Sequence, residues 1–166
     1  MKSHFTIHHK IQFWVGILAT VASLVFTIVF MLMVKKNIPI HYDWNWNPTG
    51  YGHSGTLLIV PLVMLPTNLL IVAIAYFMPP EAWNLPVKPK EGCEEILYRI
   101  TAYMLSLIVL EDGIYSLILT IAAAFQIKSL LQISTPAYLI ILTATCIIDI
   151  ILCVVKNKPK GNSFEV

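Results

Sequence analysis

The chain has 166 residues; 57% of them are hydrophobic, 12% are charged, and the formal net charge is +2. A soluble domain of this length could not bury so much apolar surface, so the composition predicts a protein whose solvent is lipid. The weak positive charge, without a basic cluster, excludes nucleic acid as an expected partner. The three cysteines, Cys93, Cys146 and Cys153, have no metal-binding or redox spacing, so we expect neither a metal site nor a disulfide framework.

Four apolar stretches are predicted to cross a bilayer as helices. Residues 11–34 carry no charged side chain. At about 1.5 Å per residue they extend roughly 36 Å, more than the hydrocarbon core of about 30 Å. The other predicted spans are residues 57–78, 98–127 and 137–155. We therefore expect one all-α domain over residues 1–166, an integral membrane four-helix protein with a structured external loop, residues 35–56, between the first two helices. Residues 79–97 form the predicted cytoplasmic loop, and residues 128–136 a short turn region.

The third span contains Glu111-Asp112-Gly113 near its middle, and this triplet leaves two interpretations open. It is either part of one long helix or a turn between two segments that are each short for a span. We favour one helix.

The second span contains two prolines, Pro61 and Pro66, followed by Asn68. Prolines free backbone carbonyls that neighbouring groups must satisfy in lipid, so this helix is predicted to be kinked and packed against partners. Asn68 is predicted to cross-link helices.

Ionisable residues inside the predicted spans are the costly features of the sequence. An acid at a helix centre costs roughly 2.5–3.5 kcal/mol on insertion scales, so each should face protein or water. Asp149 and Arg99 fall at the same depth, and we expect them to pair. Glu111 and Asp112 point about 100° apart and are predicted not to share a partner. A hydrogen bond to Asn68 or to a proline-freed carbonyl is one expected role for them, and a proton or cation relay is the functional alternative.

The basic residues predict the orientation of the spans. With four spans, eight basic residues fall on one side and three on the other, which places both termini in the cytoplasm and residues 35–56 outside. The larger set is Lys2, Lys10, Lys88, Lys90, Arg99, Lys156, Lys158 and Lys160, and the smaller is Lys35, Lys36 and Lys128.

The external loop is rich in aromatic residues, with Tyr42, Trp44, Trp46 and Tyr51 interleaved with polar side chains. The segment Asn47-Pro48-Thr49-Gly50 predicts a type I turn. One interpretation is an aromatic belt at the headgroup level. The other is a small folded cap that contacts an external ligand.

Two histidines and an aspartate of the same loop could imitate a zinc ligand set, since neutral imidazoles and a carboxylate suit that metal. These residues are His41, Asp43 and His53. Turn and belt roles explain each of them, so no metal is predicted.

The loop also carries a family resemblance. Ile38-Pro39, His41-Tyr42-Asp43 and Pro48-x-Gly50-Tyr51-Gly52, placed between two spans, resemble a widespread bacterial membrane domain of unknown function that forms the N-terminal part of SdpI-type immunity proteins. The resemblance covers roughly residues 13–77. The chain departs from the family pattern at Trp46, Thr49 and Ser54, and it shows no counterpart of the family's second half.

The resemblance implies a multi-pass protein of the bacterial cell membrane that gives resistance to an exported toxic peptide. Family members sometimes also signal by sequestering a repressor, so a cytoplasmic regulator is an implied partner besides the lipid bilayer and the toxin peptide. Aromatic side chains supply large contact area for an amphipathic peptide. In this interpretation the ligand-binding residues are His41, Tyr42, Asp43, Trp44, Trp46, Pro48, Gly50, Tyr51 and Gly52.

Two other classes stay open beside immunity or sensing. One is an ion- or proton-coupled transporter subunit using Glu111, Asp112 and Asp149, although the chain lacks the internal repeat common in transporters. The other is a structural partner subunit of a larger complex with another membrane protein. No enzymatic activity, catalytic residue or cofactor is expected.

Overall fold

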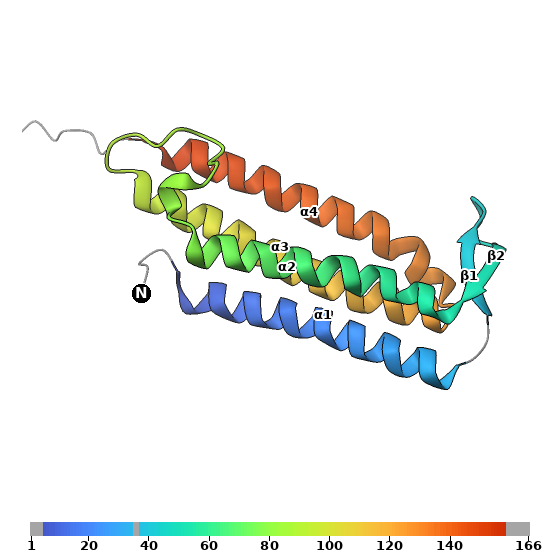
Figure 1. Ribbon diagram of the computed structural model, residues 1–166. Helices are drawn as coiled ribbons and strands as arrows, with labels where there is room; N and C mark the ends of the chain where they lie inside the picture. The colour runs from blue at the N-terminus through green and yellow to red at the C-terminus, as the bar shows by residue number, and fades with distance from the viewer. Residues whose placement is uncertain (1–4, 35–36, 159–166) are drawn as a thin grey trace, which may run out of the picture.

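The computed structural model describes residues 5–34 and 37–158, and it is a bundle of four long helices with a β-hairpin at one end (Figure 1). Each long helix is apolar and long enough to cross a membrane. In chain order the elements are α1 (Ile7–Met33), β1 (Asn37–Tyr42), β2 (Pro48–His53), the 3-10 turn η1 (Ser54–Leu58), α2 (Ile59–Phe77), the 3-10 turn η2 (Pro80–Ala82), α3 (Glu94–Ala124) and α4 (Lys128–Lys156).

Consecutive helices run in opposite directions, so α1 begins and α4 ends at the same end of the bundle (Figure 1). The connection between α2 and α3 also lies there, whereas the hairpin and the junction between α3 and α4 lie at the opposite end. The outer surface of the helices is apolar and carries exposed residues such as Leu62, Ile140 and Ile151. This surface suits lipid rather than water as its neighbour.

Helix α3 is the packing centre, and its closest contact is with α1. A Cβ atom added at Gly16 would overlap the backbone of Val109, and one added at Gly113 would overlap the backbone of Gly16. Two glycines that face each other therefore let the backbones of α1 and α3 touch. Small residues commonly serve this purpose between membrane helices, because apolar side chains gain little by leaving lipid for one another.

Buried hydroxyl and amide groups add hydrogen bonds between the helices. Ser23 Oγ of α1 donates to the Ser116 carbonyl of α3 at 3.1 Å and lies 2.8 Å from Thr120 Oγ1. Asn68 Nδ2 of α2 donates to Thr20 Oγ1 of α1 at 3.0 Å, and both residues are fully buried. The predicted role of Asn68 as a link between helices is thus confirmed.

The third helix is one continuous element, which confirms the preferred interpretation of Glu111-Asp112-Gly113. It begins at Glu94, inside the segment predicted as loop up to residue 97. Glu94 and Glu95 occupy its first turn, where negative charge is favourable at the positive end of the helix dipole. These acids are helix-starting residues, and assigning them to the mixed-charge loop was wrong.

The predicted turn over residues 128–136 is also wrong, because α4 begins at Lys128 and contains Pro136 in its interior. The actual turn is shorter. Gln126 adopts a left-handed backbone with φ of 56°, and the Ile127 N–H donates to the Ala122 carbonyl at 2.8 Å. This hydrogen bond closes α3 as a Schellman-type end, so α4 restarts after three residues. Proline interrupts helices less often in membrane proteins than in water, so Pro136 is a weak boundary signal.

The observed bounds of the first two helices lie closer to the predicted bounds than those of the last two. The first begins at Ile7 rather than at residue 11, because Thr6 and His9 form a capping box in which the Thr6 N–H donates to His9 Nδ1 at 2.9 Å. The second covers Ile59–Phe77 against a predicted 57–78. Pro61 lies in its first turn, where no intrahelical N–H is needed, and Pro66 lies in its interior.

Candidate functional site

The loop between α1 and α2, which was predicted to be external, folds as an antiparallel hairpin of β1 and β2. Its reversal runs from Asp43 to Asn47, so the type I turn predicted at Asn47–Gly50 is wrong; Pro48–His53 is a strand. Asp43 Oδ1 accepts the backbone N–H groups of Asn45 at 2.9 Å and Asn47 at 2.8 Å. Trp46 adopts a left-handed backbone with φ of 59°. An aspartate side chain that accepts hydrogen bonds from backbone N–H groups two and four residues later stabilises a turn over those residues. The chain therefore turns before it reaches Pro48.

The Asp43 side chain is exposed to solvent, and the turn that it forms shifts its pKa. The backbone N–H of Asn47, reinforced by its side-chain amide, lowers the pKa of Asp43 below its ordinary value. The carboxylate thus acts as the fixed acceptor of the turn, and this role needs no ligand.

The hairpin is anchored to the bundle at its base and near its tip. Ile38 is only 3% exposed and packs in a cluster with Leu57 and Ala124. Near the tip, Lys128 Nζ at the start of α4 donates to Asn47 Oδ1 at 3.2 Å. The segment is therefore held in one position relative to the helices.

The aromatic residues of the hairpin are presented unequally. Trp44 is fully exposed at the turn, and Tyr51 is largely exposed on β2. The rings of Tyr42 and Trp46 lie side by side, 5.8 Å apart, and are half-buried. Burial raises the pKa of Tyr42. The structure thus brings the four aromatic residues of the loop onto one small hairpin.

The remaining loop residues serve mainly its packing. Gly50 is paired with His41, and a Cβ at this glycine would lie 3.1 Å from the His41 imidazole. Gly52 leaves room for the Ile40 side chain in the same way. Pro48 faces Tyr42 at the first position of β2, where its missing N–H is tolerated.

Metal binding finds no support in the described ranges 5–34 and 37–158, which contain no group of three His, Cys, Asp or Glu side chains placed to hold an ion. His53 Nδ1 instead accepts the Gly55 N–H at 3.0 Å.

A second polar region lies where α3 meets α4, within the two helices that could span a membrane. Thr145 Oγ1 donates to Glu111 Oε1 at 2.6 Å, and Tyr138 Oη donates to Asp112 Oδ1 at 2.7 Å. The Tyr138 ring stacks on Tyr115 with ring centroids 4.1 Å apart. The two acids therefore share α4 as their partner helix, and the predicted hydrogen bonds to Asn68 or to proline-freed carbonyls are not formed.

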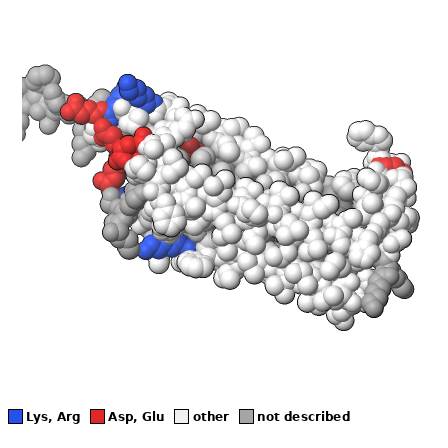
Figure 2. Space-filling model, viewed as in Figure 1, with Lys and Arg blue, Asp and Glu red and all other residues white. Residues whose placement is uncertain are grey.

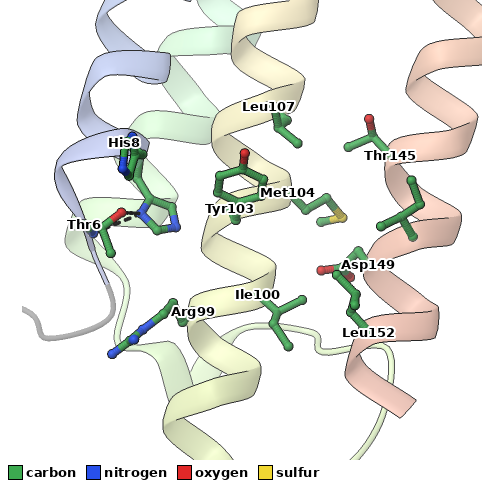
Figure 3. Close-up of a pocket in the computed structure, with 12 residues that line it drawn as sticks. Thr6, His8, Arg99, Ile100, Tyr103, Met104, Leu107, Thr145, Asp149 and Leu152 are labelled. Carbon is green, nitrogen blue, oxygen red and sulfur yellow. Dashed lines mark hydrogen bonds between the residues drawn. The ribbon is translucent and has the colours of Figure 1, made fainter. Parts of the chain in front are cut away.

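Two cavities follow this α3–α4 groove. One, of about 490 Å³, lies toward the hairpin end and is lined by Glu111, Tyr115 and Tyr138. The other, of about 370 Å³, lies toward the opposite end and is lined by residues of α3 and α4 together with the first turn of α1 (Figure 3). Thr145 lines the second cavity and is hydrogen-bonded to Glu111, which lines the first. This hydrogen bond therefore joins a residue of one cavity to a residue of the other.

Arg99 and Asp149 line the same cavity but do not form the predicted pair. Arg99 Nη2 lies 3.3 Å from Glu95 Oε1 in an exposed salt bridge one helical turn away. Figure 3 shows the Arg99 guanidinium turned away from Asp149. An i,i+4 partner on its own helix keeps the arginine exposed, whereas pairing with Asp149 would bury its charge.

The groove residues Tyr115, Tyr138 and Thr145 were missed by the sequence reasoning, although one signal was available. Tyr138 and Thr145 lie seven residues apart in an apolar helix, which places both hydroxyls on one face. Both residues lie inside the predicted span 137–155, so this face could be read from the sequence.

Comparisons of the chain with protein-family models, with curated proteins and with solved structures found no match.

Proposed function

We propose that the protein is a four-span protein of the bacterial cell membrane with both termini in the cytoplasm and the hairpin outside. The positive-inside rule supports this orientation. Most charged side chains visible in Figure 2 gather at the end where α1 begins and α4 ends. Among described basic residues, Lys10, Lys88, Lys90, Arg99, Lys156 and Lys158 belong to the proposed cytoplasmic side, and Lys128 to the other. The other four residues of the charge count, Lys2, Lys35, Lys36 and Lys160, lie outside the described residues.

At the outer end, the hairpin captures an exported amphipathic peptide, giving immunity to it or sensing it without enzymatic chemistry or a cofactor. The observation that carries this proposal is the anchored hairpin with Trp44 fully exposed at its tip. An aromatic belt needs only rings at the right depth, and it does not require a turn fixed by Asp43 and tied to α4. A pre-positioned aromatic surface binds with less loss of conformational entropy.

The resemblance to SdpI-type proteins adds the biological setting. The ligand is then a toxic peptide that reaches the cell from outside, and a signal passes to a cytoplasmic regulator or to another membrane protein.

A second candidate function, ion or proton coupling, is favoured by a specific observation in the groove. Glu111 Oε2 is buried without a hydrogen-bond partner in the described part of the chain, and Glu111 lines the larger cavity. Ionisable groups at this depth commonly mark ion or proton pathways.

The test is survival of a susceptible bacterium challenged with a panel of membrane-active killing peptides. Wild type is expected to protect, and Trp44→Ala/Trp46→Ala is expected to lose at least about tenfold in the tolerated peptide concentration, because the ring surface is removed. Thr49→Ala, on the exposed strand β2, is the matched control and should protect fully. All variants are compared at equal membrane levels.

The outcomes separate the two functions. Loss of protection in the hairpin variant alone supports capture outside the membrane. Loss in Glu111→Gln, with the hairpin variant still active, supports coupling through the groove instead. If wild type protects against no peptide of the panel, immunity to these peptides is refuted.

A further inference from the structure

The cavity beside Asp149 lies at the end of the bundle opposite the hairpin, and its one buried carboxylate is unsatisfied. Asp149 is 4% exposed, and its Oδ1 has no hydrogen-bond partner within residues 5–34 and 37–158. A buried carboxylate oxygen without a donor is strongly unfavourable, so such a group points to a missing donor.

Three polar groups around this cavity have other partners, whereas His9 Nε2 is buried without a hydrogen-bond partner in the described part of the chain. Arg99 is paired with Glu95, and His9 Nδ1 accepts the Thr6 N–H. Thr145 donates its hydroxyl to Glu111, which lines the other cavity. These side chains line the same cavity as Asp149 without supplying its Oδ1 with a hydrogen bond.

His8 and Tyr103 also line the cavity, and the rest of the lining is apolar. Ile100, Met104 and Leu107 line the cavity from α3, and Ile148 and Leu152 line it from α4 (Figure 3). A site that combines one buried carboxylate with an apolar wall is complementary to a cation with an apolar body. A free metal ion would need several oxygen ligands, and this wall does not offer them.

We propose that this cavity binds a small amphipathic amine, with its ammonium group on Asp149 and its hydrocarbon body against the α3 and α4 side chains. The volume of about 370 Å³ falls in the range of small-molecule sites and is enough for an alkylamine of medium length. The ammonium group supplies the hydrogen bonds that Asp149 lacks and neutralises its charge. The inference is independent of peptide capture at the hairpin.

The test is photo-crosslinking in phosphatidylcholine nanodiscs with an eight-carbon alkylamine that carries a diazirine. The matched alcohol and carboxylic acid with the same diazirine chain report simple partitioning into lipid. The amine is expected to label wild type at least about fivefold more than the alcohol. Mass spectrometry is expected to locate the label on cavity residues such as Ile100, Met104 or Leu152.

Variants separate binding at Asp149 from nonspecific labelling. Asp149→Asn should reduce amine labelling to the level of the alcohol, while Glu91→Gln, an exposed acid at the same end, should leave it unchanged. Leu152→Trp fills the cavity with Asp149 retained and should also lose labelling. This variant decides the question if Asp149→Asn does not fold.

Equal labelling by amine and alcohol, labelling outside the cavity, or full labelling of a folded Asp149→Asn protein would each overturn the proposal. Peptide survival is read on the same variants. If the hairpin variant loses protection against the peptides but keeps amine labelling, the two sites act independently.

Discussion

At the scale of single residues, side chains form hydrogen bonds according to what lies within reach, and the sequence alone shows only part of that. Asp43 forms the turn through its neighbours Asn45 and Asn47, a local pattern that was overlooked in favour of Pro48 and Gly50. Arg99 and Asp149 were predicted from depth alone to pair. Depth sets the level of a side chain but not its rotation about the helix, and here the arginine finds a nearer partner in Glu95.

The Asp43 turn predicts a specific pH dependence. Hydrogen bonding to Asn47 lowers the pKa of Asp43 below the ordinary 3.8, so its contribution to hairpin stability is present above that pH. The contribution is lost as the pH falls through the lowered, folded-state pKa, where the carboxylate becomes protonated. In detergent micelles, the NMR shift of the Asn47 amide proton should titrate with a midpoint below 3.8, and Asp43→Asn should remove this titration. A midpoint at or above 3.8 would contradict this account of the turn.

At the scale of elements, apolar runs predict the existence of all four helices. They do not determine where each helix begins and ends or how it is rotated about its axis. The beginning of α4 was hidden by Pro136, and the hairpin strands are short and bear no clear alternation. The acids at positions 111 and 112 were predicted to face protein or water, and both form hydrogen bonds to side chains of α4. Their partners Thr145 and Tyr138 follow from how α3 and α4 are rotated in the packed bundle, which the order of residues along one helix does not state.

The close contact of α1 and α3 predicts that Gly16 is sensitive to a single methyl group. Gly16→Ala places a Cβ against the Val109 backbone, which cannot move aside as a flexible side chain would. Overpacking of this kind typically costs about 1–3 kcal/mol. Reversible unfolding in mixed detergent micelles should show a loss of that size, with Val25→Ala, an exposed position on the same helix, as the control. Equal stability of Gly16→Ala and wild type would mean that the two helices do not touch at this point.

At the scale of the whole molecule, composition and charge predict the class of protein and its proposed orientation. The structure adds that the polar residues fall into two regions, the hairpin and the α3–α4 groove. The hairpin carries four aromatic residues at one end, while the α3–α4 groove has Glu111 in the lining of one cavity and Asp149 in the lining of the other. The hydrophobicity of the helices alone explains neither the hairpin nor the acidic residues of the groove. Both arise where the bundle supports groups that lipid would otherwise disfavour.

The orientation gives the last prediction, which can be read from outside an intact cell. In a background with the three native cysteines replaced by alanine, Trp44→Cys at the hairpin tip should react with a membrane-impermeant maleimide added to intact cells. Lys88→Cys, in the connection between α2 and α3, should react only after the membrane is permeabilised. The reason is the positive-inside rule, since the basic residues gather at the end that holds Lys88. Labelling of both positions after permeabilisation is the control for accessibility. Reaction of Lys88→Cys in intact cells, with Trp44→Cys protected, would reverse the orientation and place the hairpin in the cytoplasm, where it could not meet a peptide arriving from outside.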